Sequence, residues 1–455
     1  MSHPAGLSLL FAKVLVKLFV ALLAIVSVAE LGEGYIGGDI DACPYQNFCA
    51  ISPGPICLAV AGIIKDDYIC QWAFFKQNPH LVNQLHDFQT PLQIALVHDR
   101  IDIAKWLVTE CGADVKLNRL GTAAGPLQLT IPRGRVEMAK MLLDKGARIT
   151  STEDSRLSPL NAAVVANNLD MVKLFLDYHP HEVNVPERIS NCTPLQEAAA
   201  RGYVEMAEYL LQKGASVDQG SWKGPLKTRL PLYIAMKKGY SNMVQLLLRH
   251  GANVTGKLED GQTYLHLATS LGRTDFVRWI LEKNPDIDER NKDGRTALLI
   301  AAQNGYYTIA ELLVSHNANV NIPTINGFTP LLSAVALNHF KLVQLLVSNS
   351  ADVNAVCTLN GDTPLSVAID ADNIELAEYL VQQGADLSSI YSQALEAAAE
   401  SSGQEVAEWL LEQREFTVDA GKAALSRSVK PSITDMISAK IEAVTAQAQP
   451  TVCSV

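Results

Sequence analysis

A short motif of polar and apolar positions recurs along most of the chain. Each copy opens with Thr or a residue in its place, usually continues with Pro and has Leu third; Ala-rich sequence follows, and then a more apolar stretch. The copies begin at Thr90, Gly125, Ser158, Thr193, Leu230, Thr263, Thr296, Thr329 and Thr363. The steps between them are 35, 33, 35, 37, 33, 33, 33 and 34 residues, and such a near-constant period indicates tandem structural repeats.

Within each repeat the pattern predicts two helices joined by a tight turn. Pro is well tolerated in the first turn of a helix, and Thr or Ser before it caps the free backbone N–H groups. In several copies a glycine then interrupts the helix, as at Gly202, Gly239, Gly272 and Gly305. The stretch after it has apolar residues at i, i+3 and i+4, which predicts a second helix with one core-facing side.

These motifs resemble the ankyrin-repeat family over residues 90–387, about two-thirds of the chain. The resemblance implies an all-α ankyrin-repeat solenoid of helix-turn-helix-hairpin units of about 33 residues. The family favours a His directly after the Leu, where it ties the loops of adjacent repeats together. Here that His is present as His266; the other copies carry Gln93, Gln128, Asn161, Gln196, Tyr233, Leu299, Leu332 and Ser366.

The sequence outside the repeats is less regular, and it divides the chain into five segments. We expect 1–29 to be a signal peptide or N-terminal anchor, 30–89 a Cys-rich region with a degenerate capping repeat, 90–387 the array of nine repeats, 388–446 degenerate C-terminal capping repeats, and 447–455 a flexible tail. Helices are predicted in the C-terminal caps at 394–399, 406–411, 420–429 and 433–444, with Pro431 between the last two. Terminal repeats of a solenoid shield an open core face, so atypical sequence is expected there.

The N-terminal segment has the pattern of a secretory signal peptide. Lys13 and Lys17 precede an apolar run at 18–26, and small residues lead to a cleavage site after Ala29. We therefore expect a secreted or periplasmic protein. An uncleaved anchor remains open, because residues 7–28 are long enough to span a bilayer, and so does a helix with no membrane role.

Four of the eight cysteines gather just after the predicted cleavage site, at Cys43, Cys49, Cys57 and Cys70. In an oxidising compartment this density predicts two disulfides, in any of three pairings. A zinc site is the alternative, although the spacings of five, seven and twelve intervening residues lack the usual Cys-x-x-Cys pair.

Charge is uneven along the chain, whose formal net charge is −11. An acidic protein of this kind repels phosphate backbones, so we expect no nucleic-acid partner. The segment 213–257 is nevertheless basic, with eight basic residues and one acid, whereas 370–419 has twelve acids and one Arg. Solvated outer helix faces are the ordinary explanation of the acidic segment.

Motifs for catalysis or cofactor binding are absent from the sequence: it has no GxSxG, P-loop, HExxH or helix-opening GxGxxG. We therefore expect no enzyme activity, catalytic residues, cofactor or metal. Tyr203, Tyr240 and Tyr306 directly follow the inter-helix glycine in three repeats. Each is expected to pack over its own helix turn, and an aromatic stripe is the alternative.

The function expected from these features is binding of another protein through the concave surface and loop tips. The alternative is a membrane-tethered scaffold, with membrane contact only if 7–28 is uncleaved. The repeat step of 37 makes loop 219–229 about four residues longer than the others, and Trp and Arg are enriched in binding hot spots. We predict a contact site for an acidic protein surface at Trp222, Lys223, Lys227, Arg229, Lys237 and Lys238; docking of another copy's acidic C-terminal segment on this patch is the competing possibility.

Overall fold

The computed structural model describes residues 55–66, 74–86, 89–116, 124–149, 158–187, 190–219, 230–401 and 404–448. The chain divides into two compact units, Met1–Arg148 and Ile149–Val455. Within the described ranges the regular elements are all helices, and the one β-type pairing is an isolated bridge between His86 and Gln89. The prediction of an all-α repeat fold is therefore confirmed.

Each of the nine predicted motifs begins a helix, and each of these first helices is followed by a second one. The first helices are α4 (Pro91–Val97), α6 (Pro126–Leu129), α8 (Pro159–Val165), α10 (Pro194–Arg201), α12 (Pro231–Lys238), α14 (Tyr264–Ser270), α16 (Ala297–Asn304), α18 (Pro330–Ala336) and α20 (Pro364–Asp370). The second helices are α5 (Ile101–Thr109), α7 (Val136–Asp144), α9 (Leu169–Tyr178), α11 (Val204–Gln212), α13 (Ser241–Arg249), α15 (Thr274–Leu281), α17 (Tyr307–Ser315), α19 (Phe340–Ser348) and α21 (Ile374–Gln382).

Local capping explains where the first helices begin. The Thr193 hydroxyl accepts a hydrogen bond from the Gln196 backbone N–H at 3.3 Å, and the Thr329 hydroxyl accepts one from the Leu332 N–H at 3.1 Å. Such a cap is worth about 1 kcal/mol. The turn after the helix needs a left-handed residue, and Gly202 supplies it with φ of 73°.

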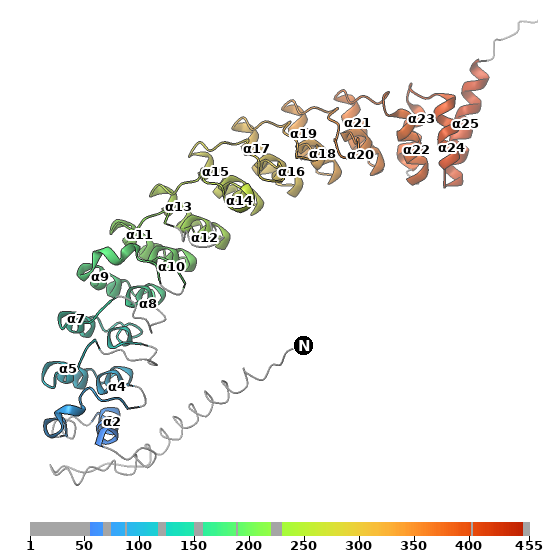
Figure 1. The fold of residues 1–455 in the computed structure, drawn as a ribbon. Helices are drawn as coiled ribbons and strands as arrows, with labels where there is room; N and C mark the ends of the chain where they lie inside the picture. Colours follow the sequence, from blue (N-terminus) through green and yellow to red (C-terminus); the bar gives the residue numbers. More distant parts are fainter. Residues whose placement is uncertain are drawn as a thin grey trace, which may run out of the picture. The chain divides into compact units, whose positions relative to one another are not determined.

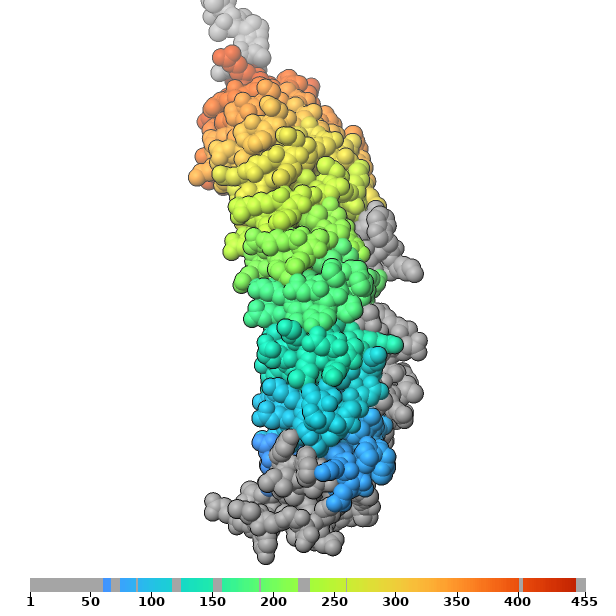
Figure 2. All heavy atoms as spheres, turned by 90° about the vertical axis from the view of Figure 1, so that its left-hand side faces the viewer, coloured from blue at the N-terminus to red at the C-terminus, as the bar shows by residue number. Residues whose placement is uncertain are grey.

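The second unit stacks its repeats in chain order. Its first helices lie in one row and its second helices in another (Figure 1), and the repeats appear as successive bands of colour (Figure 2). In α15 the side chains of Phe276, Val277 and Ile280 are fully buried. Ala301 and Ala302 in α16 are buried as well, and their small side chains let neighbouring first helices approach closely.

Asparagine side chains join consecutive repeats where the second helices end. Asn321 donates to the Ser350 carbonyl at 3.0 Å and accepts from the Asp352 N–H at 2.8 Å. Asn354 repeats this arrangement with Gly384 and Asp386, at 3.1 and 2.8 Å. These bonds pair backbone groups of the residues that follow each second helix, and they link consecutive repeats.

The predicted capping helices are present at the C-terminal end. They are α22 (Tyr391–Ser401), α23 (Gln404–Glu412), α24 (Val418–Arg427) and α25 (Pro431–Ala448). Pro431 is the first residue of α25 rather than part of a separate linker, in the position where proline is best tolerated. In the first unit, α2 (Pro55–Lys65), a helical turn at 74–77 and a 3-10 helix, Pro79–Leu81, precede the array.

Candidate protein-binding surface

The loops between repeats form hairpins in the second unit, which we call fingers. Four of them span 258–262, 291–295, 324–328 and 357–362. Each is closed by a backbone hydrogen bond between its first and last residue, of 2.7, 3.0, 2.9 and 2.8 Å in that order. A finger is therefore a defined turn rather than an open loop.

Neighbouring fingers contact one another through their backbones. The Lys292 N–H donates to the Asp260 carbonyl at 3.0 Å, and the Ile325 N–H donates to the Asp293 carbonyl at 3.3 Å. The Cys357 thiol donates to the Asn326 carbonyl at 3.3 Å. These bonds hold the fingers in one row, so that their tips present a pre-formed surface.

Large apolar side chains lie exposed on, or directly before, two neighbouring fingers. Ile325 is 67% exposed, Val356 is 58% exposed and Leu359 is 66% exposed; we call these three residues the apolar tips. In the finger at 258–262, by contrast, Leu258 is only 7% exposed. Exposed aliphatic residues on a rigid backbone are typical of surfaces that bind another macromolecule.

His266 connects the fingers to the first helices. The Thr263 backbone N–H donates to His266 Nδ1 at 3.2 Å, and Nε2 lies 2.8 Å from the Arg295 carbonyl in the next finger. The two bonds together assign the proton to Nε2. Burial lowers the pKa of His266 below its ordinary value, so the ring is neutral at pH 7.

Glutamine makes the same two bonds in the first repeat. The Thr90 N–H donates to Gln93 Oε1 at 2.8 Å, and Gln93 Nε2 donates to the Ala124 carbonyl of the next repeat at 3.1 Å. The family resemblance assigned the link between adjacent loops to His. Gln93 makes the same link in the first repeat. The third repeat uses a buried carboxylate, because Glu187 Oε2 accepts from the Ser158 N–H at 2.6 Å.

Two of the six predicted contact residues fall within the described part of the chain. Lys237 and Lys238 are exposed and end α12, whereas loop 219–229 joins the beginning of that helix. Trp222, Lys223, Lys227 and Arg229 lie outside the described residues, as do Cys43, Cys49 and Cys70 and the side chain of Cys57.

Ion pairs neutralise part of the basic segment. Lys213 Nζ lies 3.2 Å from Asp177, and this bond raises the pKa of Lys213. Lys257 Nζ lies 2.7 Å from Glu289 and holds the pKa of that carboxyl below its ordinary value. Lys237 and Lys238 form no ion pair with any residue that the structure describes.

Two of the three tyrosines at the inter-helix turns, Tyr240 and Tyr306, lie against the preceding repeat. A β-carbon built on Gly202 would lie 3.1 Å from the ring of Tyr240, and one on Gly272 would lie 3.1 Å from the ring of Tyr306. Each of these two rings therefore covers the glycine of the preceding repeat, a contact that the prediction did not include. The absence of a side chain on that glycine leaves room for a flat ring from the next repeat.

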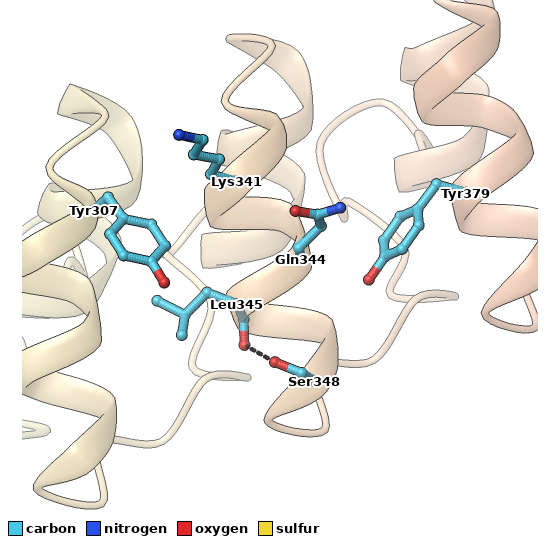
Figure 3. Close-up of a pocket in the computed structure, with 6 residues that line it drawn as sticks. All are labelled: Tyr307, Lys341, Gln344, Leu345, Ser348 and Tyr379. Carbon is cyan, nitrogen blue, oxygen red and sulfur yellow. Dashed lines mark hydrogen bonds between the residues drawn. The ribbon is translucent and has the colours of Figure 1, made fainter.

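An open hollow of about 500 Å³ lies on the outer faces of α17, α19 and α21. Figure 3 shows Tyr307 and Tyr379 on either side of Lys341 and Gln344. Ser348 Oγ is occupied by a bond to the Leu345 carbonyl at 2.9 Å. The Tyr307 hydroxyl donates to the Glu311 carboxylate on the same helix at 3.2 Å.

The described residues form neither a metal-binding cluster nor a membrane-spanning helix. None of their His, Cys, Asp and Glu side chains form a group of three that could hold a metal ion. Their helices are too short or too polar to cross a bilayer. Residues 7–28, where an anchor was considered, lie outside the described residues.

A family model for ankyrin repeats matches residues 57–153, 131–221, 222–291, 283–357 and 349–421. These matches cover most of the chain, and the fold agrees with them, so the chain belongs to the ankyrin-repeat family. Ankyrin repeats are typically non-catalytic scaffolds for protein–protein interaction.

Two similar proteins are much longer than this chain. The ankyrin repeat and KH domain-containing protein mask-1 of Caenorhabditis elegans is 28% identical over 132 residues, which are 28% of this chain and 5% of that protein. Alpha-latrocrustotoxin-Lt1a of Latrodectus tredecimguttatus is 26% identical over 185 residues, which are 30% of this chain and 13% of the toxin. The match to both is confined to a small part of their length.

Proposed function

We propose that this chain is an exported, non-enzymatic binding protein that holds a partner protein on its finger tips and the adjacent first helices. The observation that carries this proposal is the exposure of Ile325, Val356 and Leu359 on neighbouring fingers. Aliphatic side chains at loop tips lower the solubility of a protein that has no partner for them. Because the fingers are joined by backbone bonds, little conformational entropy is lost when a partner binds.

The apolar tips are large enough to matter for affinity. Complete burial of an aliphatic side chain is worth roughly 1.5–3 kcal/mol. Since each tip is 58–67% exposed, covering one would contribute roughly 1–2 kcal/mol by the same proportion. Replacing all three by Asp should therefore weaken partner binding by a factor on the order of 10²–10⁴.

Loop 219–229 is a second proposed contact, supported by its length and composition. Trp222 would supply an apolar anchor, and Lys223, Lys227 and Arg229 would steer an acidic surface toward it. Lys237 and Lys238, at the far end of α12, would add to the long-range attraction.

Export rests on the N-terminal sequence pattern, and the alternative is a scaffold tethered by uncleaved residues 7–28. Mass spectrometry of the N-terminus of the native protein separates the two. A chain that begins at Glu30 supports export, and a chain that retains residues 7–28 supports the tether.

The binding proposal is tested by affinity for the partner recovered from the native compartment. The Ile325→Asp/Val356→Asp/Leu359→Asp variant is compared with wild type by calorimetry. Val429→Asp is the matched control, because Val429 is 68% exposed but lies next to the C-terminal capping helices. Equal affinity of the triple variant and the control would contradict the role of the finger tips.

A further inference from the structure

The turns between first and second helices form a second continuous surface in the second unit, which we call the turn edge. Its side chains bridge consecutive repeats. Arg273 Nη1 donates to the Gly239 carbonyl at 3.4 Å, and Asn373 Nδ2 donates to Asn338 Oδ1 at 2.8 Å. Together with the tyrosine rings over Gly202 and Gly272, these contacts fix the edge as a firm surface.

The two ends of the turn edge carry opposite charges. Lys237 and Lys238 are the last two residues of α12, Asp370 is the last residue of α20, and Asp372 lies in the turn after α20. All four residues are exposed, and none forms an ion pair with a described residue. The acidic end continues into α22 and α23 with Glu400 and Glu405, which are exposed as well.

Apolar side chains lie on the edge between the charged ends. Tyr307, the first residue of α17, is 38% exposed, and Leu337, at the turn after α18, is 51% exposed. Tyr240, beside the lysines, is 36% exposed. The charged groups are thus separated by a strip whose burial would be favourable.

The spacing of these features is symmetric. The lysines lie two repeats before the turn after α16, and the aspartates lie two repeats after it. A twofold axis at that turn would place Lys237 and Lys238 of one copy opposite Asp370 and Asp372 of another, and the reverse pairs would form at the other end. An interface around a twofold axis must be self-complementary in this way.

We propose that the turn edge binds a second copy of this chain in antiparallel orientation, centred on the turn after α16. Pairing within one copy is excluded by distance, because four repeats with helices packed 8–10 Å apart separate the charges by roughly 30–40 Å. A second copy is favoured over an unrelated acidic partner because the same edge carries both the lysines and the aspartates, at equal distances from the turn after α16. The fingers lie at the opposite ends of the first helices, so the dimer leaves them accessible.

The experiment is a charge exchange on the full chain, followed by sedimentation equilibrium at low and high salt. Lys237→Glu/Lys238→Glu places acids opposite acids at both ends, and Asp370→Lys/Asp372→Lys places bases opposite bases. Each variant alone should dimerise at least about tenfold more weakly than wild type, since like charges that face each other repel. A mixture of the two variants should form a heterodimer, because its contacts are again between opposite charges.

Matched controls separate this pairing from a general effect of charge. Arg249→Glu/Lys283→Glu reverses two exposed charges at or just after the C-terminal ends of second helices and should leave the dimer unchanged. The finger variant at Ile325, Val356 and Leu359 should also dimerise normally, so loss of partner binding and loss of the dimer are distinguishable. A monomeric wild type, a Lys variant that dimerises normally, or a mixture that fails to restore association would overturn the proposal.

Discussion

The contribution of finger stacking to stability can be measured by replacing a glycine with alanine at either of two equivalent turns. Gly327 and Gly361 hold the same position in consecutive fingers, with φ of 86° and 82°. A β-carbon on Gly327 would overlap the backbone nitrogen of Thr358 and lie 2.6 Å from its hydroxyl oxygen, whereas one on Gly361 would meet no atom within 4 Å. The difference arises because α22 begins soon after α21 and no finger follows 357–362.

The two substitutions to Ala should therefore differ in cost. An alanine in the left-handed region is strained by roughly 1–2 kcal/mol, and this is the whole cost expected for Gly361→Ala. Gly327→Ala adds a clash with backbone that a side-chain rotation cannot relieve, and overpacking of this kind costs roughly 1–3 kcal/mol more. We expect a total loss of about 2–5 kcal/mol for Gly327→Ala.

Hydrogen exchange measured by mass spectrometry reports this loss where it occurs, since repeat proteins open locally. Gly327→Ala should speed exchange in the peptides covering 324–328 and 357–362, and lower the urea midpoint measured by far-UV circular dichroism. Gly361→Ala should leave exchange at 324–328 near the wild-type rate. Equal losses for the two variants would refute the conclusion that backbone contacts hold the fingers in a row.

Three further predictions follow from the site and the sequence. Because burial lowers the pKa of His266 in the folded protein, the unfolded chain binds a proton at a higher pH than the folded chain does, and the protein should lose stability as pH falls below about 6.5. Urea titrations of His266→Gln should lack this loss at low pH. The variant should remain stable at pH 7, because Gln93 makes equivalent bonds in the first repeat. Cys43, Cys49, Cys57 and Cys70 should resist a thiol label until a reductant is added, and labelling of all four without reductant would refute the predicted disulfides. Trp222→Ala with Lys223→Glu and Lys227→Glu should lower partner affinity and flatten its salt dependence in a calorimetric titration, whereas unchanged values in a folded variant would exclude the loop from the binding surface.

The helices were largely predictable because their signals are local. A capping Thr or Ser, a first-turn Pro and a glycine after the helix each act within a few residues of the chain. The helix starts at Thr193 and Thr329, and the end before Gly202, could therefore be inferred without knowledge of the tertiary fold.

Contacts between repeats were less accessible to sequence reasoning. Gln93 was noted as a departure from the family His, yet its amide makes equivalent bonds to the next repeat. The packing of Tyr240 on Gly202 depends on a residue 38 positions away, and no local pattern marks it.

The apolar tips were missed for a related reason. Leu258 and Leu359 both lie at or near a finger, but one is buried and the other is 66% exposed. An apolar residue in a loop can fold back or point outward, and only its neighbours in space decide which. Only their exposure in the folded protein therefore points to Ile325, Val356 and Leu359 as the proposed binding surface.

Site-specific photo-crosslinking tests the binding of a partner at the finger tips most directly. A photoreactive amino acid is introduced at Leu359 or, as a control, at Val429, which is equally exposed at 68%, and the protein is irradiated in its native compartment. The account predicts that a partner protein is crosslinked through position 359 and not through position 429. It also predicts that this adduct is lost when Ile325 and Val356 are changed to Asp. Equal adducts at both positions, or none at 359 while the partner still co-purifies with the chain, would contradict the account.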